Sequence, residues 1–247
     1  METHQVTPVS IIIPTLNEEH YLPILLESLT RLIAELDVVV VDGGSTDATL
    51  SVGEKFISRF PTPSSLRILS SPRGLSLQRN SGAAVAKHEL LLFLDADVVI
   101  PSNETFQKLV TSFIESRCAA GVAHLAPLEG TVRGHIAYFF FDLTQRICLW
   151  FHKPYLGTFC LITTKEVFNA IRGFDITKPV TEDIDFCFKA KQIGRVIQLP
   201  LSIPVSERRF QKYGYFNVFR IYVTQGWIFL TTGSVRLRKD TYPFGEY

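Results

Sequence analysis

Short apolar runs alternate with longer amphipathic segments through the first hundred residues. The apolar runs cover Val9–Ile13, Val38–Val41, 65–71 and 89–97. Between them, apolar residues over 18–36 and small residues over 76–88 recur at the spacing of a helix. Strands that are apolar on both faces and alternate with helices are typical of a parallel sheet covered on both sides. The pattern therefore predicts an α/β fold.

Polar side chains stand where three of these runs end. Asp42 and Asp95 follow two of them, and Thr15 follows a third after Pro14, which we expect to end its strand because proline cannot donate to a sheet ladder. Parallel sheets bind ligands outside the carboxyl ends of their strands. We therefore expect these residues to converge on one crevice, with Asp95 and Asp97 facing a ligand rather than the core.

The second half of the chain carries a less regular pattern. A helix is predicted over 104–116, a strand over 118–127, a strand, helix and turn over 157–175, and a pair of strands over 196–205. An amphipathic helix over 181–194 would be capped by Gly194. Ser45 or Thr46 is the expected cap of a helix that follows the second strand.

Composition narrows the class of protein. The chain has 247 residues, of which 46% are hydrophobic, and its formal net charge is +1. A near-neutral balance argues against a nucleic-acid binder. The four cysteines form no CxxC pair, so we expect reduced core residues in a cytosolic protein. The polar N-terminal residues do not resemble a signal peptide.

The Asp-x-Asp pair at 95 and 97 indicates a cation site. Two carboxylates at a strand end can hold Mg²⁺ or Mn²⁺, whose hard oxygen ligands are often completed by substrate phosphates. The alternative is a helix N-cap followed by a solvated acid. Asp-x-Asp alone does not decide between them.

Five motifs occur in a fixed order between Val9 and Val196: PTLNEE, VDGGSTDAT, QRNSGAAVAKHELLLFLDAD, GFD and TEDIDF. Together they resemble the family 2 glycosyltransferases of the GT-A fold. The resemblance implies a Rossmann-like, mostly parallel sheet flanked by helices in residues 1–205. It would have a nucleotide-binding half at about 1–100 and an acceptor half at about 101–205. Residues 206–247 would form a basic, aromatic, helical tail.

The resemblance also implies a nucleotide-sugar donor, carrying UDP or GDP, and a divalent cation. The positions that match the donor-binding segments are Pro14, Thr15, Glu18, Asp42, Gly43, Ser45 and Arg79. Asp95 matches the acid on the ribose and metal side, and Asp97 matches the direct metal ligand. The structural alternatives are a turn-forming role for Asp42 and a surface position for Arg79.

The acids of TEDIDF match the family's catalytic motif. Asp183 is the expected general base of an inverting reaction, with Glu182 binding the acceptor or orienting the base, and Asp185 as an alternative base. The plain alternative is that these acids favour the helix dipole. Gly157 and Thr158 would border the acceptor, and His124 could touch acceptor or metal, although a lone histidine is more often structural.

Arg209 belongs to a basic stretch, Ser206–Gly214, whose loop could fold over the diphosphate and offset its charge. The alternative is that this stretch is only a solvated basic turn. This stretch lacks the QxxRW pattern of processive relatives, which favours transfer of a single sugar.

Two aromatic segments are each compatible with more than one binding partner. The uncharged stretch Ile221–Val235 and the aromatic run Ile136–Phe151 could lie in a membrane interface, or pack on the domain or on a second copy in a homodimer. Lipid-linked acceptors are common among similar enzymes, although this acceptor is unknown. We expect a cytoplasmic protein, with the inner face of the membrane as the alternative location.

Two other functions compete. A phosphatase of the haloacid dehalogenase type also has an apolar strand that ends in Asp-x-Asp, but there the motif stands near the start of the chain. A catalytically silent module that only binds nucleotide sugars is the second alternative, and the intact acids Asp95, Asp97 and Asp183 argue against it.

Overall fold

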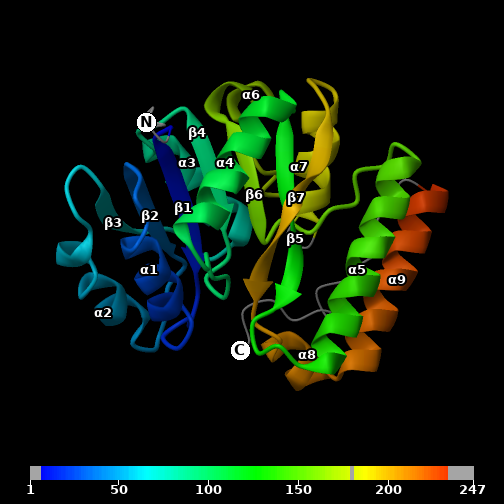
Figure 1. Ribbon diagram of the computed structural model, residues 1–247, viewed down its shortest axis with the longest axis horizontal. Coiled ribbons are helices and arrows are strands. Elements are labelled where there is room, and N and C mark those ends of the chain that lie inside the picture. The colour runs from blue at the N-terminus through cyan, green and yellow to red at the C-terminus, as the bar shows by residue number, and fades with distance from the viewer. Residues whose placement is uncertain (1–6, 179–180, 233–247) are drawn as a thin grey trace.

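The computed structural model describes residues 7–178 and 181–232, which form one seven-stranded sheet flanked by helices (Figure 1). The strands are β1 Val9–Thr15, β2 Leu36–Asp42, β3 Ser65–Ser70, β4 Leu90–Leu94, β5 Ala120–Pro127, β6 Cys160–Thr164 and β7 Val196–Val205. Their order is β3-β2-β1-β4-β6-β5-β7. Only β6 runs antiparallel to its neighbours β4 and β5. The mostly parallel α/β class is thereby confirmed.

Helices cover both faces of the sheet because the strands are apolar on both sides. In β1, Ile11 and Ile13 enter one buried cluster, with residues of α1 and α4, while Ile12 enters a second cluster, with residues of α3, α6 and α7. The helices are α1 Leu22–Thr30, α2 Thr49–Glu54, α3 Leu75–Val85, α4 Asn103–Ser116, α5 Val132–Trp150, α6 Lys165–Ala170, α7 Glu182–Lys191, α8 Arg208–Tyr213 and α9 Tyr215–Thr232.

Several boundaries in the first half differ from the sequence expectation. Pro14 lies inside β1 rather than after it, at a point where pairing with β4 has already stopped after Ile12. The first helix covers only Leu22–Thr30 of the expected range, and Ile33, beyond its end, is 75% exposed. The second helix begins at Thr49, because the side chain of Ser45 bonds to Asp42 instead of capping a helix.

The second half also corrects two expectations. Residues 196–205 form one strand, β7, instead of a pair, and its register against β5 shifts between Ala123 and His124. Helix α7 ends at Lys191 with Gln192 as its cap, so the expected cap Gly194 lies beyond the end. Residues of the basic stretch 206–214 form the short helix α8 rather than a loop.

The two aromatic segments form a pair of helices. Helix α5 contains most of the run 136–151, and α9 contains residues 221–232 of the uncharged stretch 221–235, whose remaining positions lie outside the described residues. Phe140 of α5 contacts Phe219 of α9 with ring centroids 5.3 Å apart, and the two helices lie side by side at the right of Figure 1. Within residues 7–178 and 181–232, no helix has the length and apolar character needed to cross a membrane.

Candidate active site

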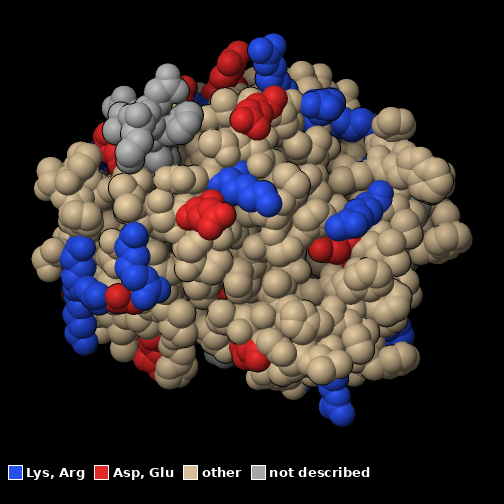
Figure 2. All heavy atoms as spheres, viewed as in Figure 1, with Lys and Arg blue, Asp and Glu red and all other residues tan. Residues whose placement is uncertain are grey.

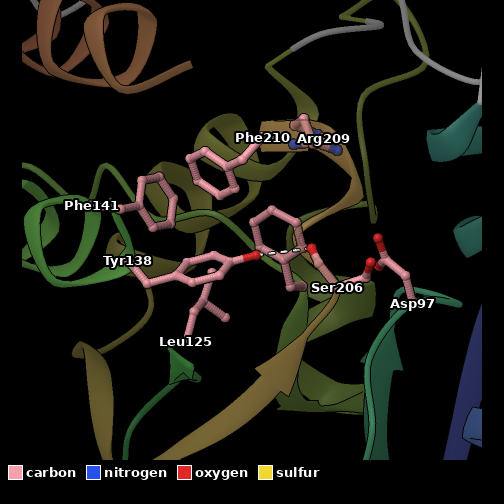
Figure 3. Close-up of a pocket in the computed structure, with 8 residues that line it drawn as sticks. Asp97, Leu125, Tyr138, Phe141, Ser206, Arg209 and Phe210 are labelled. Atoms are coloured by element: carbon pink, nitrogen blue, oxygen red, sulfur yellow. Dashed lines mark hydrogen bonds between the residues drawn. The ribbon is translucent and has the colours of Figure 1, made fainter. Parts of the chain in front are cut away.

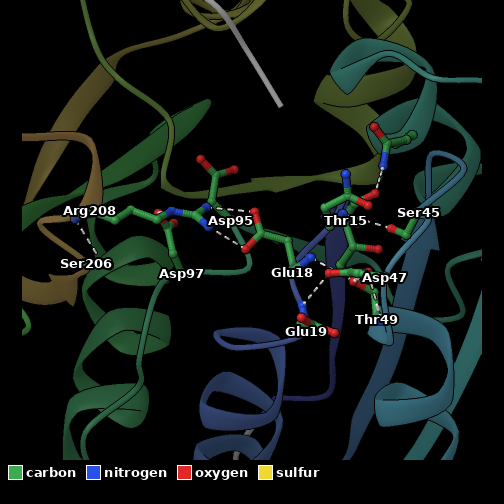
Figure 4. Close-up of polar contacts among 12 residues, drawn as sticks. Thr15, Glu18, Glu19, Ser45, Asp47, Thr49, Asp95, Asp97, Ser206 and Arg208 are labelled. Atoms are coloured by element: carbon green, nitrogen blue, oxygen red, sulfur yellow. Dashed lines mark hydrogen bonds and ion pairs between the residues drawn. The ribbon is translucent and has the colours of Figure 1, made fainter. Parts of the chain in front are cut away.

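Two loops at the carboxyl ends of β1 and β2 are fastened to each other. The Ser45 hydroxyl accepts a hydrogen bond from Asn17 N (2.9 Å), and Asn17 Oδ1 accepts one from Thr46 N (2.9 Å). Thr49 Oγ1 accepts the N–H of Glu18 at 2.7 Å. These bonds, drawn in part in Figure 4, hold Glu18 at the edge of the sheet.

Asp42 organises the turn that follows β2. Its Oδ2 accepts the backbone N–H groups of Gly44 and Ser45 at 2.9 and 3.0 Å, and its Oδ1 accepts the Ser45 hydroxyl at 2.5 Å. Gly43 lies beneath Gln78, whose side-chain amide donates to the carbonyls of Thr15 and Val41. A Cβ at Gly43 would come within 2.9 Å of that amide, so the close approach here is to Gln78.

Arg79 joins acids from the two halves of the chain. This arginine is 2% exposed; its Nη2 donates to Asp95 Oδ1 at 2.8 Å, and its Nη1 lies 3.4 Å from Glu182 Oε1. Its guanidinium also lies 5.1 Å from the centre of the Phe174 ring. Arg79 is therefore a buried bridge between β4 and α7 and not a surface residue.

Arg208 closes the same group of acids from the C-terminal side. Its Nη1 and Nη2 each donate to Glu18 at 2.7 Å, and its Nε donates to Asp97 Oδ2 at 3.0 Å. The guanidinium lies over the ring of Tyr21, 4.6 Å from its centre. In Figure 4, Arg208 extends between Asp97 and Glu18, with Asp95 beside them.

Glu182 and Asp183 begin α7 next to this bridge. Burial raises the pKa values of both carboxyl groups above the ordinary range. The negative charge of Asp183 adds to this effect at Glu182, and the negative charge of Asp95 adds to it at Asp183. Asp183 accepts the N–H of Ile184 at 2.7 Å. Among the described residues, Glu182 Oε2 and the buried Thr158 hydroxyl have no hydrogen-bond partner.

Other candidates lie apart from this group. Asp185 pairs with Lys178 and with Lys189, whose Nζ is 2.7 Å from its Oδ2. His124 pairs with Asp142 at 3.1 Å, and within the described residues it makes no hydrogen bond or ion pair with Asp95 or Asp97.

Arg209 and Gly157 flank a small crevice beside Asp97. Asp97, Tyr138 and Arg209 are among the residues that line it, and the Tyr138 hydroxyl donates to the Ser206 carbonyl at 3.0 Å (Figure 3). Arg209 lies 5.5 Å from the centre of the Phe159 ring. Gly157 donates its N–H to Gln145, and a Cβ there would come within 2.9 Å of Phe141.

We define the carboxylate cluster by the acids and arginines that act on one another electrostatically at this edge. Its members are Glu18, Asp95, Asp97, Glu182, Asp183, Arg79, Arg208 and Arg209. Burial raises the pKa of Glu18 to about 7 despite Arg208, and burial likewise raises the pKa of Asp95. The raised pKa values show that the three arginines and the surrounding hydrogen bonds do not fully stabilise the ionised form of these acids, and a bound cation would supply that stabilisation.

The carboxylate ligands at this site suit a cation that keeps some of its coordination positions for other ligands. Within the described residues, no group of three or more histidine, cysteine or acidic side chains is arranged to hold a metal. Asp95 and Asp97 offer carboxylate oxygens alone, which fits Mg²⁺ or Mn²⁺ completed by phosphate oxygens. The position beside Asp97 already takes a positive group, the guanidinium of Arg208.

Sequence reasoning gave too little weight to two residues. It grouped Arg208 with its basic neighbours and selected Arg209, although Arg208 makes the contacts with Glu18 and Asp97. It did not single out Gln78, which stands one position before the selected Arg79 and closes the turn at Gly43. A polar side chain in a helix of small residues was the available signal for Gln78.

Comparison with known proteins identifies the family. The model described as glycosyl transferase family 2 matches residues 10–172. The chain belongs to glycosyl transferase family 2. Among relatives of this family 2 chain, the poly(ribitol-phosphate) β-N-acetylglucosaminyltransferase TarS of Staphylococcus aureus is 36% identical over 109 residues, which are 43% of this chain and 18% of TarS. A PGL/p-HBAD biosynthesis glycosyltransferase of Mycobacterium tuberculosis is 37% identical over 108 residues, 42% of this chain and 41% of that protein. The matches thus span less than half of these relatives.

Solved structures show that the family 2 chain has the GT-A fold. Mannosyltransferase PcManGT of Pyrobaculum calidifontis, in complex with GDP-Man and Mn²⁺, matches with a TM-score of 0.70 and 19% identity, over 96% of this chain and 67% of that chain. Staphylococcus aureus TarS in complex with UDP matches with a TM-score of 0.60 and 21% identity, over 95% of this chain and 68% of that chain.

Proposed function

We propose that this family 2 chain is an inverting, metal-dependent glycosyltransferase that moves one sugar from a UDP- or GDP-sugar to an acceptor hydroxyl. The carboxylate cluster carries the proposal, because Arg79 joins Asp95 to Glu182 beside Asp183. Acids suited to the donor and acids suited to the acceptor therefore lie at one sheet edge. Sugar transfer needs both sets of acids close together, because the acceptor hydroxyl attacks the same sugar carbon that the nucleoside diphosphate leaves. The UDP and GDP-Man complexes of the structural relatives support the donor class.

The proposed donor half is residues 1–100, and the proposed acceptor half is residues 101–205. The fastened loops after β1 and β2 would hold the nucleoside, with Asp42 on the base side. The proposed donor-binding residues are Pro14, Thr15, Glu18, Asp42, Gly43, Ser45, Arg79, Asp95 and Arg209. The rigid turn around Asp42 supports this role, because groups held in place lose little freedom when a ligand binds.

Asp95 and Asp97 would hold Mg²⁺ or Mn²⁺. When bound, the cation neutralises charge on the leaving nucleoside diphosphate. Arg208 occupies Oδ2 of Asp97, so this arginine would turn toward the diphosphate when the cation takes that oxygen. Arg208 and Arg209 would then provide charge-assisted hydrogen bonds to the phosphates.

Asp183 would take the proton of the acceptor hydroxyl. Burial raises its pKa, which brings the carboxylate closer to the basicity that proton abstraction near neutral pH requires. Asp185 is a weaker candidate, because its two carboxylate oxygens are already paired with Lys178 and Lys189. Glu182, held by Arg79, would position Asp183, and Gly157 would border the acceptor.

Calorimetry on the full chain tests the donor half of the proposal. UDP or GDP is expected to bind in the presence of Mn²⁺ and to bind far more weakly without it. Asp97→Asn is expected to lower metal-dependent binding by about 10–100-fold or more, because a neutral amide replaces a carboxylate ligand of the cation. Asp37→Asn, an acid at the opposite sheet edge, is the matched control and should leave binding unchanged. Absence of binding of either nucleotide with Mn²⁺ would refute the proposal.

The competing functions predict other outcomes. A silent binding module would bind nucleotide sugar without releasing nucleoside diphosphate in the presence of any acceptor tested. The phosphatase alternative is disfavoured by the family match and by the position of Asp95 after the fourth strand. The acceptor stays unidentified, with lipid-linked molecules as the class we propose to test first. Four buried cysteines without disulfides support our expectation of a cytoplasmic location.

A further inference from the structure

The solvent side of the α5–α9 pair is unusually apolar. Both helices bury one side, through residues such as Phe141 and Phe229. Their opposite sides expose large apolar residues to solvent. We call this surface the outer apolar face; it consists of Val132, Ile136, Phe139, Leu143, Ile147, Trp150, Phe216, Val223 and Trp227.

The face is continuous rather than scattered. Its α5 members recur at intervals of three or four residues from Val132 to Trp150, so they form one stripe along the helix. That stripe is about 27 Å long at the rise of an α-helix. Phe139, which is 63% exposed, contacts Phe140, and Phe140 contacts Phe219 of α9. The ring contacts therefore connect the two helices.

An open groove extends the apolar surface toward the sheet. It has a volume of about 620 Å³ and lies between α5 and the strands β5 and β7. Ile136 and Phe139 of the outer apolar face also line this groove. Single exposed apolar residues are ordinary in proteins, whereas a surface of this extent marks a contact with another body.

The exposed charges carried by the two helices have one sign. Arg133, Arg146 and Arg220 are the exposed charged residues of the described parts of α5 and α9. The acid of α5, Asp142, is 14% exposed, lines the groove and is paired with His124. Most of the surface over these helices, at the right of Figure 2, is uncharged. The face therefore combines aromatic residues with isolated positive charges.

We propose that the outer apolar face docks on a bilayer surface that contains anionic lipids. Aromatic side chains would enter the region between head groups and acyl chains, while the arginines contact lipid phosphates. A second copy of the chain is a poorer occupant, because a two-fold dimer presents the same patch from both sides and the described parts of α5 and α9 offer exposed arginines but no exposed acid to pair with them. The inference stands on exposure and charge, independently of sugar transfer.

Docking would also place the carboxylate cluster near the lipid surface. Helix α8, which carries Arg208, is joined to α9 through Gly214, and Thr131 before α5 donates to Glu207 before α8 at 2.5 Å. An acceptor carried by a lipid would then meet the cluster without leaving the membrane. This consequence rests on the proposed function, whereas the docking itself does not.

Tryptophan fluorescence gives a direct test. The whole chain has two tryptophans, Trp150 and Trp227, which are 80% and 67% exposed and both lie in the outer apolar face. Adding vesicles of phosphatidylcholine with phosphatidylserine to the full chain is expected to shift the emission to shorter wavelength and to sediment the protein. Vesicles of phosphatidylcholine alone should bind several-fold less, and added salt should weaken binding to the anionic vesicles.

Variants distinguish docking through the outer apolar face from non-specific adsorption to vesicles. Phe139→Ser and Arg146→Glu should each lower the vesicle-bound fraction several-fold, whereas Ile33→Ser, at an exposed isoleucine outside the face, should not. Circular dichroism and nucleoside diphosphate binding should be the same for all three, so a failure of the proposed function would show separately. Unshifted emission with anionic vesicles would overturn the proposal. A blue emission without vesicles, accompanied by a dimer in sedimentation, would assign the face to a second copy instead.

Discussion

The two edges of the sheet treat buried acids in opposite ways. At the amino edge, Asp37 in β2 accepts hydrogen bonds from the Ser10 hydroxyl at 2.9 Å, from Arg67 at 2.7 Å and from the Lys87 N–H at 2.9 Å. Burial alone would raise the pKa of Asp37, but the hydrogen bonds from these donors together have the larger effect, so the pKa lies below its ordinary value. At the carboxyl edge, the acids of the carboxylate cluster outnumber their arginines, and burial raises the pKa values of Glu18, Asp95 and Asp183.

The difference separates an acid that stabilises the fold from acids kept for a ligand. Asp37 has its partners within the protein, so its charge is compensated as soon as the chain folds. In the carboxylate cluster, by contrast, the charged form of the acids is not fully stabilised, and Glu182 Oε2 has no partner among the described residues. Folding alone would not select that arrangement, because unpaired buried acids destabilise a protein. Perturbed acids gathered in one place are typical of functional sites.

The largest expected effect lies at the carboxyl edge. Asp183→Asn should lower turnover by about 10²–10⁴-fold, since it removes the proposed base. Donor binding in calorimetry should stay as in the unmodified chain, because Asn keeps the size of the side chain. Asp185→Asn is the matched control on the same helix and should retain most activity. Unchanged turnover in Asp183→Asn would remove the base assignment, and a large loss in Asp185→Asn would transfer it.

The amino edge should respond through stability instead. Asp37→Asn is expected to lower the free energy of unfolding by about 1.5–3 kcal/mol at pH 7, because hydrogen bonds to a charged acceptor are lost. Urea denaturation with circular dichroism measures this change.

The pH dependence of that effect follows from the lowered pKa of Asp37. A lowered pKa stabilises the folded state above the unfolded value of about 4 and stops doing so as pH falls through the folded value. The difference in unfolding free energy between the unmodified chain and Asp37→Asn should therefore shrink below about pH 4. A difference that grows as pH falls would show that Asp37 does not act as a paired carboxylate.

The smallest effect is expected at Arg208. Arg208→Gln removes the positive group from Asp97 and should strengthen binding of Mn²⁺ alone by about twofold to fivefold, the range of a partly exposed ion pair. The same variant should weaken binding of nucleoside diphosphate with Mn²⁺, because a phosphate partner is lost. Calorimetry of both titrations checks the two signs. Weaker binding of Mn²⁺ alone would show that Arg208 does not compete for Asp97.

Local pattern was enough to predict where Asp42, Asp95 and Asp97 lie. Apolar runs that alternate with helices imply parallel strands, and the carboxyl ends of parallel strands share an edge. The same reasoning could not predict that both carboxylate oxygens of Asp42 accept hydrogen bonds within its own turn, because these bonds depend on the orientation of the Asp42 and Ser45 side chains. Roles in binding and catalysis stay predictions.

Contacts across long sequence separations were beyond local pattern. The bridge from Arg79 to Glu182 spans 103 positions, and no spacing rule relates a helix of small residues to the start of α7. The predicted boundaries of elements were wrong where a single side-chain contact decides them. Ser45, for example, bonds to Asp42 and does not cap a helix. The aromatic runs were recognised, but their joining into one face required the packing of α5 on α9.

The bond between Arg208 and Glu18 also has a consequence for biosynthesis. The two residues are 190 positions apart, so Glu18 is added to the nascent chain about 10 to 40 seconds before Arg208. Until Arg208 is added, the nascent chain carries Glu18, and later Asp97, without the arginine that closes over them. This corner of the molecule is therefore completed late in translation, and until then it offers its carboxylates to whatever cations the surrounding solution contains.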